Sequence, residues 1–162
     1  MEQHKKFSLM SPGLKSNDPC PREYVMPKKG GKNISPCLKW ENAPEGTKSF
    51  VLTCIDPHPI ANYWVHWMVI NIPATIHELP LDASNKKMPS GCIEINNSFG
   101  FKGYGGPQPP DGTGTHPYIF SVYALNIENL QVPGTFLTEA QLEKTIEQFK
   151  IGHAEFTLTY GN

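Results

Sequence analysis

The sequence has almost no net charge, no long apolar run and no recognisable leader. Its 14 basic residues nearly balance 15 acidic ones, so no overall field attracts nucleic acid or an anionic membrane. No stretch approaches the ~20 apolar residues of a membrane-spanning helix, and the first six residues hold no apolar run before a cleavage site. We therefore expect a cytoplasmic protein with no nucleic-acid partner and no membrane span, in which any anion site is local.

Signatures of catalysis and metal binding are also scarce. The four cysteines, Cys20, Cys37, Cys54 and Cys92, form no C-x-x-C pair and have no zinc-like spacing, which indicates free thiols but leaves a disulfide open. The sequence contains no Gly-x-Ser-x-Gly elbow, and no cysteine carries the local signature of a nucleophile. We expect no catalytic residue, no structural metal and no cofactor.

Proline and glycine, in contrast, are abundant. Sixteen prolines and 14 glycines, spread along 162 residues, predict many turns and short strands rather than a helical bundle. The length fits a single domain, residues 1–162, that would bury roughly 70% of the surface of its unfolded chain.

Apolar runs locate the main strands. Ser49–Asp56 has high β-propensity and is stopped by Pro57. Residues 64–72 are almost continuously apolar, as in a strand buried on both faces in the middle of a sheet, and β character resumes over residues 118–126. Strict alternation along residues 64–72 would place His66 on the opposite face from its neighbour Trp67.

One helix is predicted near the C-terminus. Thr138 followed by Gln141 forms a capping box, and apolar residues then repeat at helical spacing up to Phe149. We expect the helix to end at Gly152 and a last strand to cover residues 153–160.

Two distant segments each place a histidine where a strand meets a loop. The first contains Asp56 and His66, and the second is a Gly/Pro loop over residues 103–118 that ends in His116 and Tyr118. Protonated imidazole and a tyrosine hydroxyl donate to anionic oxygens, while a carboxylate orients a histidine and raises its proton affinity. Backbone N–H groups of the loop would complete the cradle. The combination predicts a rigid pocket for a phosphate or carboxylate.

Each residue also has a simpler interpretation. His66 fits a hydrogen-bonded core histidine, Asp56 before a proline fits a turn, and Trp64 fits the core as well as a pocket wall. Two histidines and an aspartate also suit a facial metal triad, so acid–base or metal-assisted hydrolysis remains an alternative.

Four segments together carry a resemblance to a known family. They are residues 31–36 with Leu38 and Trp40, residues 56–57, residues 64–67 with 71–73, and residues 103–107 continued by Pro109, Pro110, Gly112, His116, Tyr118 and residues 123–125. In this order and over almost the whole chain, the sequence resembles a phosphatidylethanolamine-binding protein of the small bacterial and archaeal type, similar to Raf kinase inhibitor protein.

The resemblance implies a mainly β fold in which a large central antiparallel sheet packs with a smaller sheet, with few peripheral helices. It implies an anion pocket that is not an established catalytic centre. The family's pocket residues fall on Asp56, His66, His116 and Tyr118, and its pocket walls fall on Trp64, Pro109 and Pro110.

The same resemblance suggests partners. The expected ligand is a small anion such as phosphate or phosphoethanolamine, held by a non-catalytic binding protein that regulates a kinase or another protein. Inhibition of a kinase or a protease through a protein interface is the alternative from the interaction class.

Two positions depart from the family pattern. His58 stands where the family usually has a second aspartate, and Pro117 stands where it usually has arginine after the loop histidine. The first change removes a carboxylate from the pocket rim and adds a titratable base. We therefore expect phosphate or phosphoethanolamine to bind more strongly near pH 6 than near pH 8, because His58 or His66 would be protonated at the lower pH.

Overall fold

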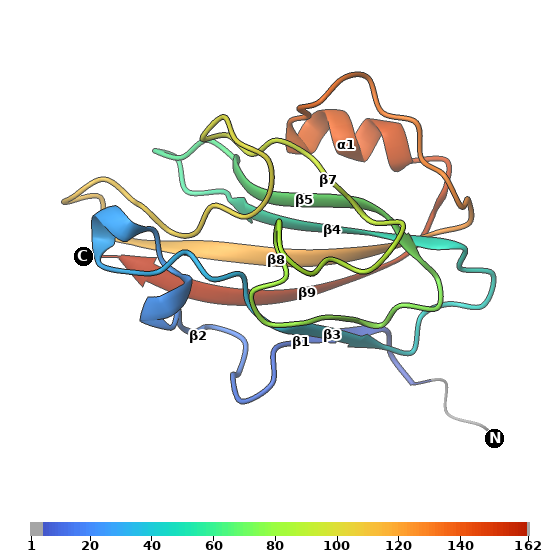
Figure 1. The fold of residues 1–162 in the computed structure, drawn as a ribbon, viewed down its shortest axis with the longest axis horizontal. Helices are drawn as coiled ribbons and strands as arrows, with labels where there is room; N and C mark the ends of the chain where they lie inside the picture. The colour runs from blue at the N-terminus through green and yellow to red at the C-terminus, as the bar shows by residue number, and fades with distance from the viewer. Residues whose placement is uncertain (1–4, 162) are drawn as a thin grey trace.

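The computed structural model describes residues 5–161, which form two β-sheets with α1 (Glu139–Ile146) on one side (Figure 1). The large sheet contains, in spatial order, β2 (Asp18–Pro19), β9 (Lys150–Gly161), β8 (Thr115–Leu125), β4 (Ser49–Asp56), β5 (Trp64–Pro73) and β7 (Ile93–Glu94). The small sheet contains β1 (Ser8–Met10), β3 (Leu38–Glu41) and β6 (Glu78–Leu79), and two short 3₁₀ helices cover Arg22–Tyr24 and Pro27–Lys29. The predicted fold class is confirmed, with one detail added: the β2–β9 pair at one edge is parallel.

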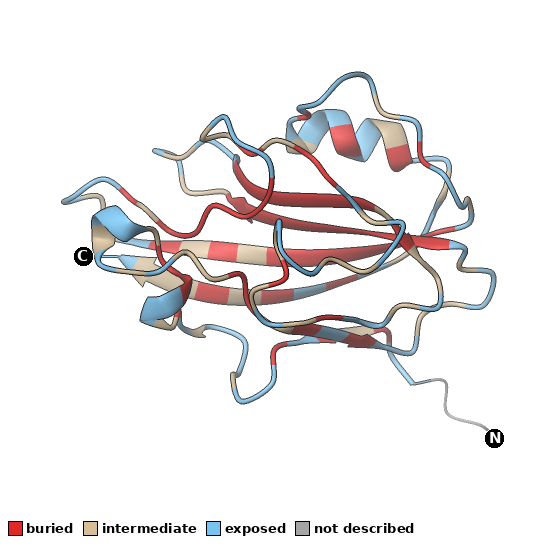
Figure 2. Ribbon diagram, viewed as in Figure 1, coloured by how far each residue is buried: buried red, intermediate tan, exposed pale blue. Residues whose placement is uncertain are grey.

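Alternation along the central strands divides the core into two layers. On β4, Phe50 and Leu52 belong to the cluster shared with the small sheet, whereas Val51 and Ile55 belong to the cluster beneath α1. Because successive strand residues point to opposite faces, the large sheet is the middle layer between the small sheet and the helix. Figure 2 shows the result, with β4 and β5 buried along most of their length.

A β-bulge corrects the face predicted for His66. Cys54 pairs with Trp67 and Ile55 pairs with Val65, so His66 is an extra residue on β5. The ring of His66 therefore lies 5.0 Å from that of Tyr118, on the face where Trp67 is also buried. The prediction that His66 and Trp67 face opposite sides is wrong, because a bulge redirects a side chain that simple alternation would send elsewhere.

The C-terminal helix begins as predicted but ends earlier. Thr138 and Gln141 form the reciprocal capping box, which confirms the start. The helix ends at Ile146, and Gly152 lies inside β9, where it pairs with Ala124. A Cβ at Gly152 would lie 2.6 Å from Pro44 Cγ, so the glycine permits close packing of a strand instead of ending a helix.

The longest elements are strands. At eight residues, α1 is far too short to span a bilayer, and no helix within residues 5–161 has the length and apolar character to cross a membrane.

Candidate functional site

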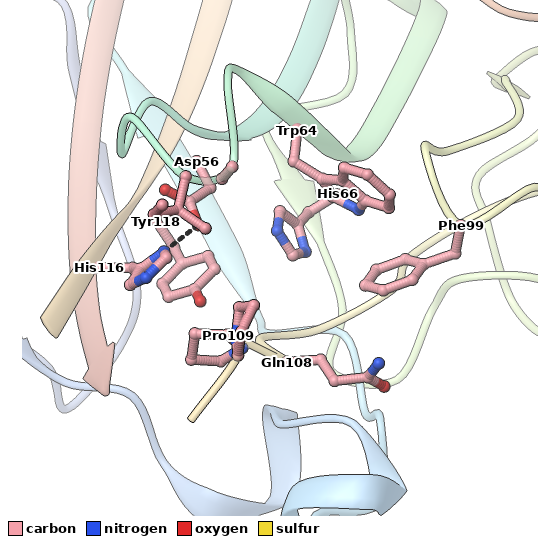
Figure 3. Close-up of a pocket in the computed structure, with 11 residues that line it drawn as sticks. Asp56, Trp64, His66, Phe99, Gln108, Pro109, His116 and Tyr118 are labelled. Carbon is pink, nitrogen blue, oxygen red and sulfur yellow. Dashed lines mark hydrogen bonds and ion pairs between the residues drawn. The ribbon is translucent and has the colours of Figure 1, made fainter. Parts of the chain in front are cut away.

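A pocket of about 280 Å³ opens at one end of the large sheet, where β4 ends and where β5 and β8 begin (Figure 3). Its lining residues are Asp56, Ile60, Ala61, Trp64, His66, Phe99, Gln108, Pro109, Pro110, His116 and Tyr118. All seven residues predicted as ligand contacts are among them. The structure brings these residues together, while their binding of a ligand stays a prediction.

Asp56 and His116 form a buried pair at the base of the pocket. Asp56 Oδ2 lies 2.6 Å from His116 Nδ1, and both side chains are almost completely shielded from solvent. The other carboxylate oxygen accepts the backbone N–H of His58 at 2.9 Å, which fixes the carboxylate at the exit of β4. Such partners are needed because a buried charge without them is costly.

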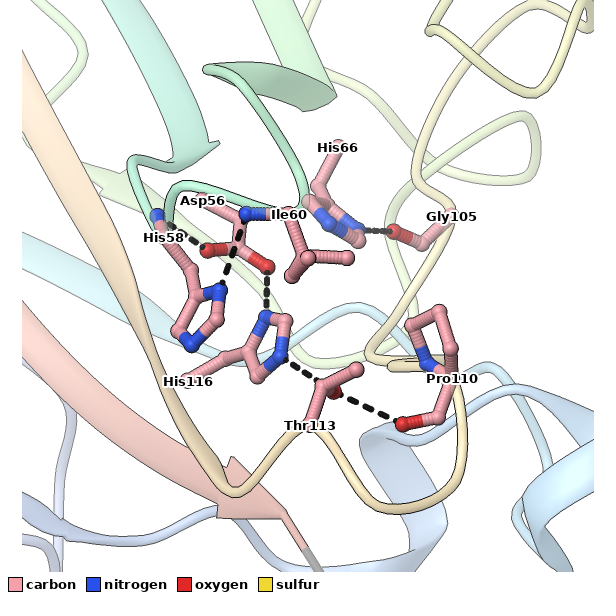
Figure 4. A network of polar contacts seen from close by, with 8 residues as sticks. All are labelled: Asp56, His58, Ile60, His66, Gly105, Pro110, Thr113 and His116. Carbon is pink, nitrogen blue, oxygen red and sulfur yellow. Dashed lines mark hydrogen bonds and ion pairs between the residues drawn. The ribbon is translucent and has the colours of Figure 1, made fainter.

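Hydrogen-bond roles fix the protons of this pair (Figure 4). The Thr113 hydroxyl donates its only proton to the Pro110 carbonyl at 2.7 Å, so it accepts from His116 Nε2 at 2.8 Å. Nε2 is therefore protonated, and a second proton lies between Nδ1 and Asp56. The Asp56–His116 pair as a whole carries no net charge.

His66 is a neutral acceptor. Its Nδ1 lies 2.6 Å from the Gly105 carbonyl oxygen, which can only accept, so Nδ1 carries the proton and Nε2 does not. Burial lowers the pKa of His66 to about 4, against the opposing effect of the Gly105 carbonyl. The predicted protonation of His66 near pH 6 is therefore wrong.

His58 lies against His116 and is not among the lining residues. The two rings stack with centroids 3.8 Å apart. His58 Nδ1 accepts the backbone N–H of Ile60 at 3.1 Å, so that nitrogen keeps its lone pair and the ring is neutral in this arrangement. The structure thus gives His58 a supporting position behind His116 instead of the predicted rim position.

The structure contradicts the predicted cradle for four of the loop amides. The four backbone N–H groups of residues 103–106 all donate within the protein, to Ile95 O, Ser84 Oγ, His66 O and Asn33 Oδ1 in turn. A Cβ at Gly106 would collide with the Tyr24 carbonyl oxygen, so this glycine permits close backbone packing. These amides are not available to an anion.

Tyr118 is a buried donor in the pocket wall. The residue is only 2% exposed, yet its hydroxyl has no hydrogen-bond partner within residues 5–161. Burial, followed by the Asp56 carboxylate, raises the pKa of Tyr118 above its usual range, so the hydroxyl keeps its proton. Figure 3 shows Tyr118 among the side chains that line the pocket.

Sequence reasoning missed four lining residues, Ile60, Ala61, Phe99 and Gln108. Phe99 packs edge-on against Trp64 at 5.3 Å and against His66 at 5.5 Å, and Gln108 lies beside Pro109. Phe99 lies between the predicted strands, without the periodicity that marks a strand. The one available signal was an aromatic pair, Phe99 and Phe101, around Gly100.

The donor set does not support the metal alternative. No group of three or more His, Cys, Asp or Glu side chains in the described part of the chain is arranged to hold a metal ion. Asp56, His66 and His116 therefore do not form a facial triad. The predicted free thiols are confirmed for Cys20, Cys37, Cys54 and Cys92.

Comparisons with known proteins agree with this architecture. A family model described as phosphatidylethanolamine-binding protein matches residues 11–161. The UPF0098 protein YbcL of Escherichia coli is 38% identical over 98% of this chain and 89% of its own length. The UPF0098 protein YbhB of the same organism is 44% identical over 78% of this chain and 82% of its own length.

Solved structures show the same fold. The crystal structure of E. coli YbcL, described as a member of the mammalian PEBP family, has a TM-score of 0.87 and 37% identity, covering 98% of this chain and 99% of its own. The homologue CT736 from Chlamydia trachomatis has a TM-score of 0.81 and 29% identity, covering 97% of this chain and 98% of its own.

Proposed function

The chain belongs to the phosphatidylethanolamine-binding protein family, and we propose that it is a non-catalytic binding protein whose pocket holds the phosphate or carboxylate group of a small ligand. The observation that carries this proposal is the unpartnered Tyr118 hydroxyl, buried in the pocket wall. A buried donor without an acceptor costs free energy, and an anionic oxygen would satisfy it.

The neighbouring polar groups suit the same ligand. The protonated Nε2 of His116 bonds to Thr113, which a ligand oxygen can replace. Asp56 balances the charge of His116, so an anion does not enter against a net negative pair. Around these groups, Trp64, Phe99 and Pro109 supply apolar walls that keep water away and strengthen each hydrogen bond.

His66 adds a requirement on the ligand. Because its Nδ1 donates to Gly105, its Nε2 can only accept, so the ligand should bring a donor as well as an acceptor. A singly ionised phosphomonoester provides both, through one P–O⁻ and one P–OH. Phosphoethanolamine provides an ammonium donor in addition.

The test is calorimetric titration of phosphoethanolamine into wild type and Tyr118→Phe. Loss of one hydrogen bond to a charged ligand should weaken binding roughly tenfold. Tyr123→Phe is the matched control, because Tyr123 is a buried tyrosine of the same strand whose hydroxyl bonds Glu143 on the other face. Equal affinity of wild type and Tyr118→Phe, or no binding by the wild type, would contradict the proposal.

Two finer statements stay predictions. Regulation of a kinase or a protease follows only from the family resemblance. The other is a cytoplasmic location, which stays an expectation from the sequence.

A further inference from the structure

A second hollow, of about 610 Å³, lies between the start of β5 and the first half of α1. Residues that line it include Asn62, Tyr63, Trp64, Phe136, Glu139 and Glu143. Trp64 also lines the ligand pocket, so the two hollows share one wall. We call this second hollow the aromatic groove.

Three aromatic side chains of the groove are exposed to solvent. Tyr63 is 56% exposed, Phe136 is 42% exposed and Trp64 is 36% exposed. Tyr63 has a backbone φ of 59° directly after Asn62 at 51°, a left-handed conformation that is uncommon for a bulky residue. Exposed aromatic side chains that cluster along one hollow are typical of protein interfaces.

Two carboxylates lie beside these rings. Glu139 and Glu143 stand one helical turn apart, a spacing at which like charges repel. The pKa of Glu139 is raised above its usual value, chiefly by burial and to a smaller extent by the negative charges of Glu143 and Glu155. Neither Glu139 nor Glu143 takes part in an ion pair among residues 5–161, although the Tyr123 hydroxyl donates to Glu143 at 3.4 Å.

We propose that the aromatic groove docks a segment of a partner protein that presents an arginine next to an apolar side chain. A guanidinium stacks on an aromatic face and forms paired hydrogen bonds to a carboxylate, and the groove offers both. Within residues 5–161, no lysine or arginine lines the groove to compete for the two carboxylates. Bound arginine would relieve the repulsion between Glu139 and Glu143. The inference does not depend on which ligand fills the pocket.

The test uses three short peptides, acetyl-Leu-Arg-Leu-amide and its Phe and Trp analogues, titrated into ¹⁵N-labelled protein at low ionic strength. Changes in the amide chemical shifts should concentrate on residues 62–65 and 136–143. These changes should become smaller when salt is added. Replacement of arginine by citrulline keeps the shape but removes the charge, and should weaken binding about fivefold or more. Equal binding of the arginine and citrulline peptides, or shifts elsewhere on the surface, would overturn the proposal.

Variants separate the groove from general charge effects. The double variant Glu139→Gln, Glu143→Gln should bind the arginine peptides only as weakly as wild type binds the citrulline peptides. Glu147→Gln, at the residue that directly follows α1 and lies outside the groove, should leave binding unchanged. Thermal melting confirms that the variants are folded. Failure of every peptide to bind wild type, or a dimer in sedimentation that Phe136→Ser abolishes, would assign the groove to another occupant and reject a basic partner.

Discussion

His58 lies flat against His116, with ring centroids 3.8 Å apart and planes within 11° of parallel. His116 is in turn paired with Asp56, so His58 supports the polar base of the pocket without lining it. A neutral ring over a protonated one is an attractive arrangement. His58 is also one of the two positions at which the sequence departs from the family pattern, so its stacking has a consequence for ligand preference.

The first prediction concerns this stack. His58→Asp should weaken binding of phosphoethanolamine about fivefold, because it adds a negative charge near the ligand and removes the stacked ring. His58→Phe should bind more tightly than His58→Asp, because it keeps a ring over His116. His77→Asp makes the same change of charge on an exposed residue near Phe50 and should have no effect. Calorimetric titration measures all three, and an equal loss in His77→Asp would point to long-range charge instead of stacking.

The second prediction concerns pH. A phosphomonoester should bind more strongly near pH 6 than near pH 8, because its second pKa is about 6 and only the singly ionised form brings a donor for His66. The cause is the ligand and not the protein, since a pKa of about 4 leaves His66 neutral at both values. Dimethyl phosphate has a fixed charge and should bind equally at both values. If dimethyl phosphate also bound more tightly at pH 6 than at pH 8, the pH dependence would come from protonation of a histidine of the protein and not from the ligand.

The third prediction concerns acid stability. Burial lowers the pKa of His66 from 6.5 to about 4, so the unfolded chain takes up a proton before the folded protein does. This difference in pKa contributes about 3 kcal/mol to the free energy of unfolding. The contribution is complete above pH 6.5 and is lost as the pH falls towards 4. Urea unfolding of wild type and His66→Gln from pH 7 to pH 4.5 should give a flatter pH dependence for the variant. His77→Gln is the exposed control, and identical slopes for wild type and His66→Gln would contradict the assignment.

Much of the site could be predicted because local signals mark the ends of its strands. The β-branched run of β4 is stopped by Pro57, which locates Asp56 at the strand exit, and the Gly/Pro loop locates His116 at the start of β8. Adjacent antiparallel strands β4, β5 and β8 then bring these ends together.

The errors arose where distant partners decide the outcome. The bulge at His66 depends on the register with β4, which strand propensity does not contain. The loop amides donate to groups such as Ser84 Oγ and Asn33 Oδ1, whose proximity is set by the fold. Beyond Ile146, the chain leaves the helix and from Lys150 pairs with β8, so tertiary pairing overrides the apolar repeat that favoured a longer helix.

The final prediction distinguishes the Tyr118 hydroxyl, which we propose binds a ligand, from the Tyr104 hydroxyl, which stabilises the fold. Tyr104 and Tyr118 are both buried, but the Tyr104 hydroxyl donates to the Tyr24 carbonyl at 2.7 Å, whereas the Tyr118 hydroxyl has no partner in residues 5–161. Tyr104→Phe should lower the free energy of unfolding by about 1–2 kcal/mol, because it leaves a buried carbonyl without its donor. Tyr118→Phe should leave stability unchanged or raise it, because it removes an unsatisfied group. Urea unfolding in the absence of ligand measures both, and a loss of stability in Tyr118→Phe equal to that in Tyr104→Phe would mean that the Tyr118 hydroxyl serves the fold and not a ligand.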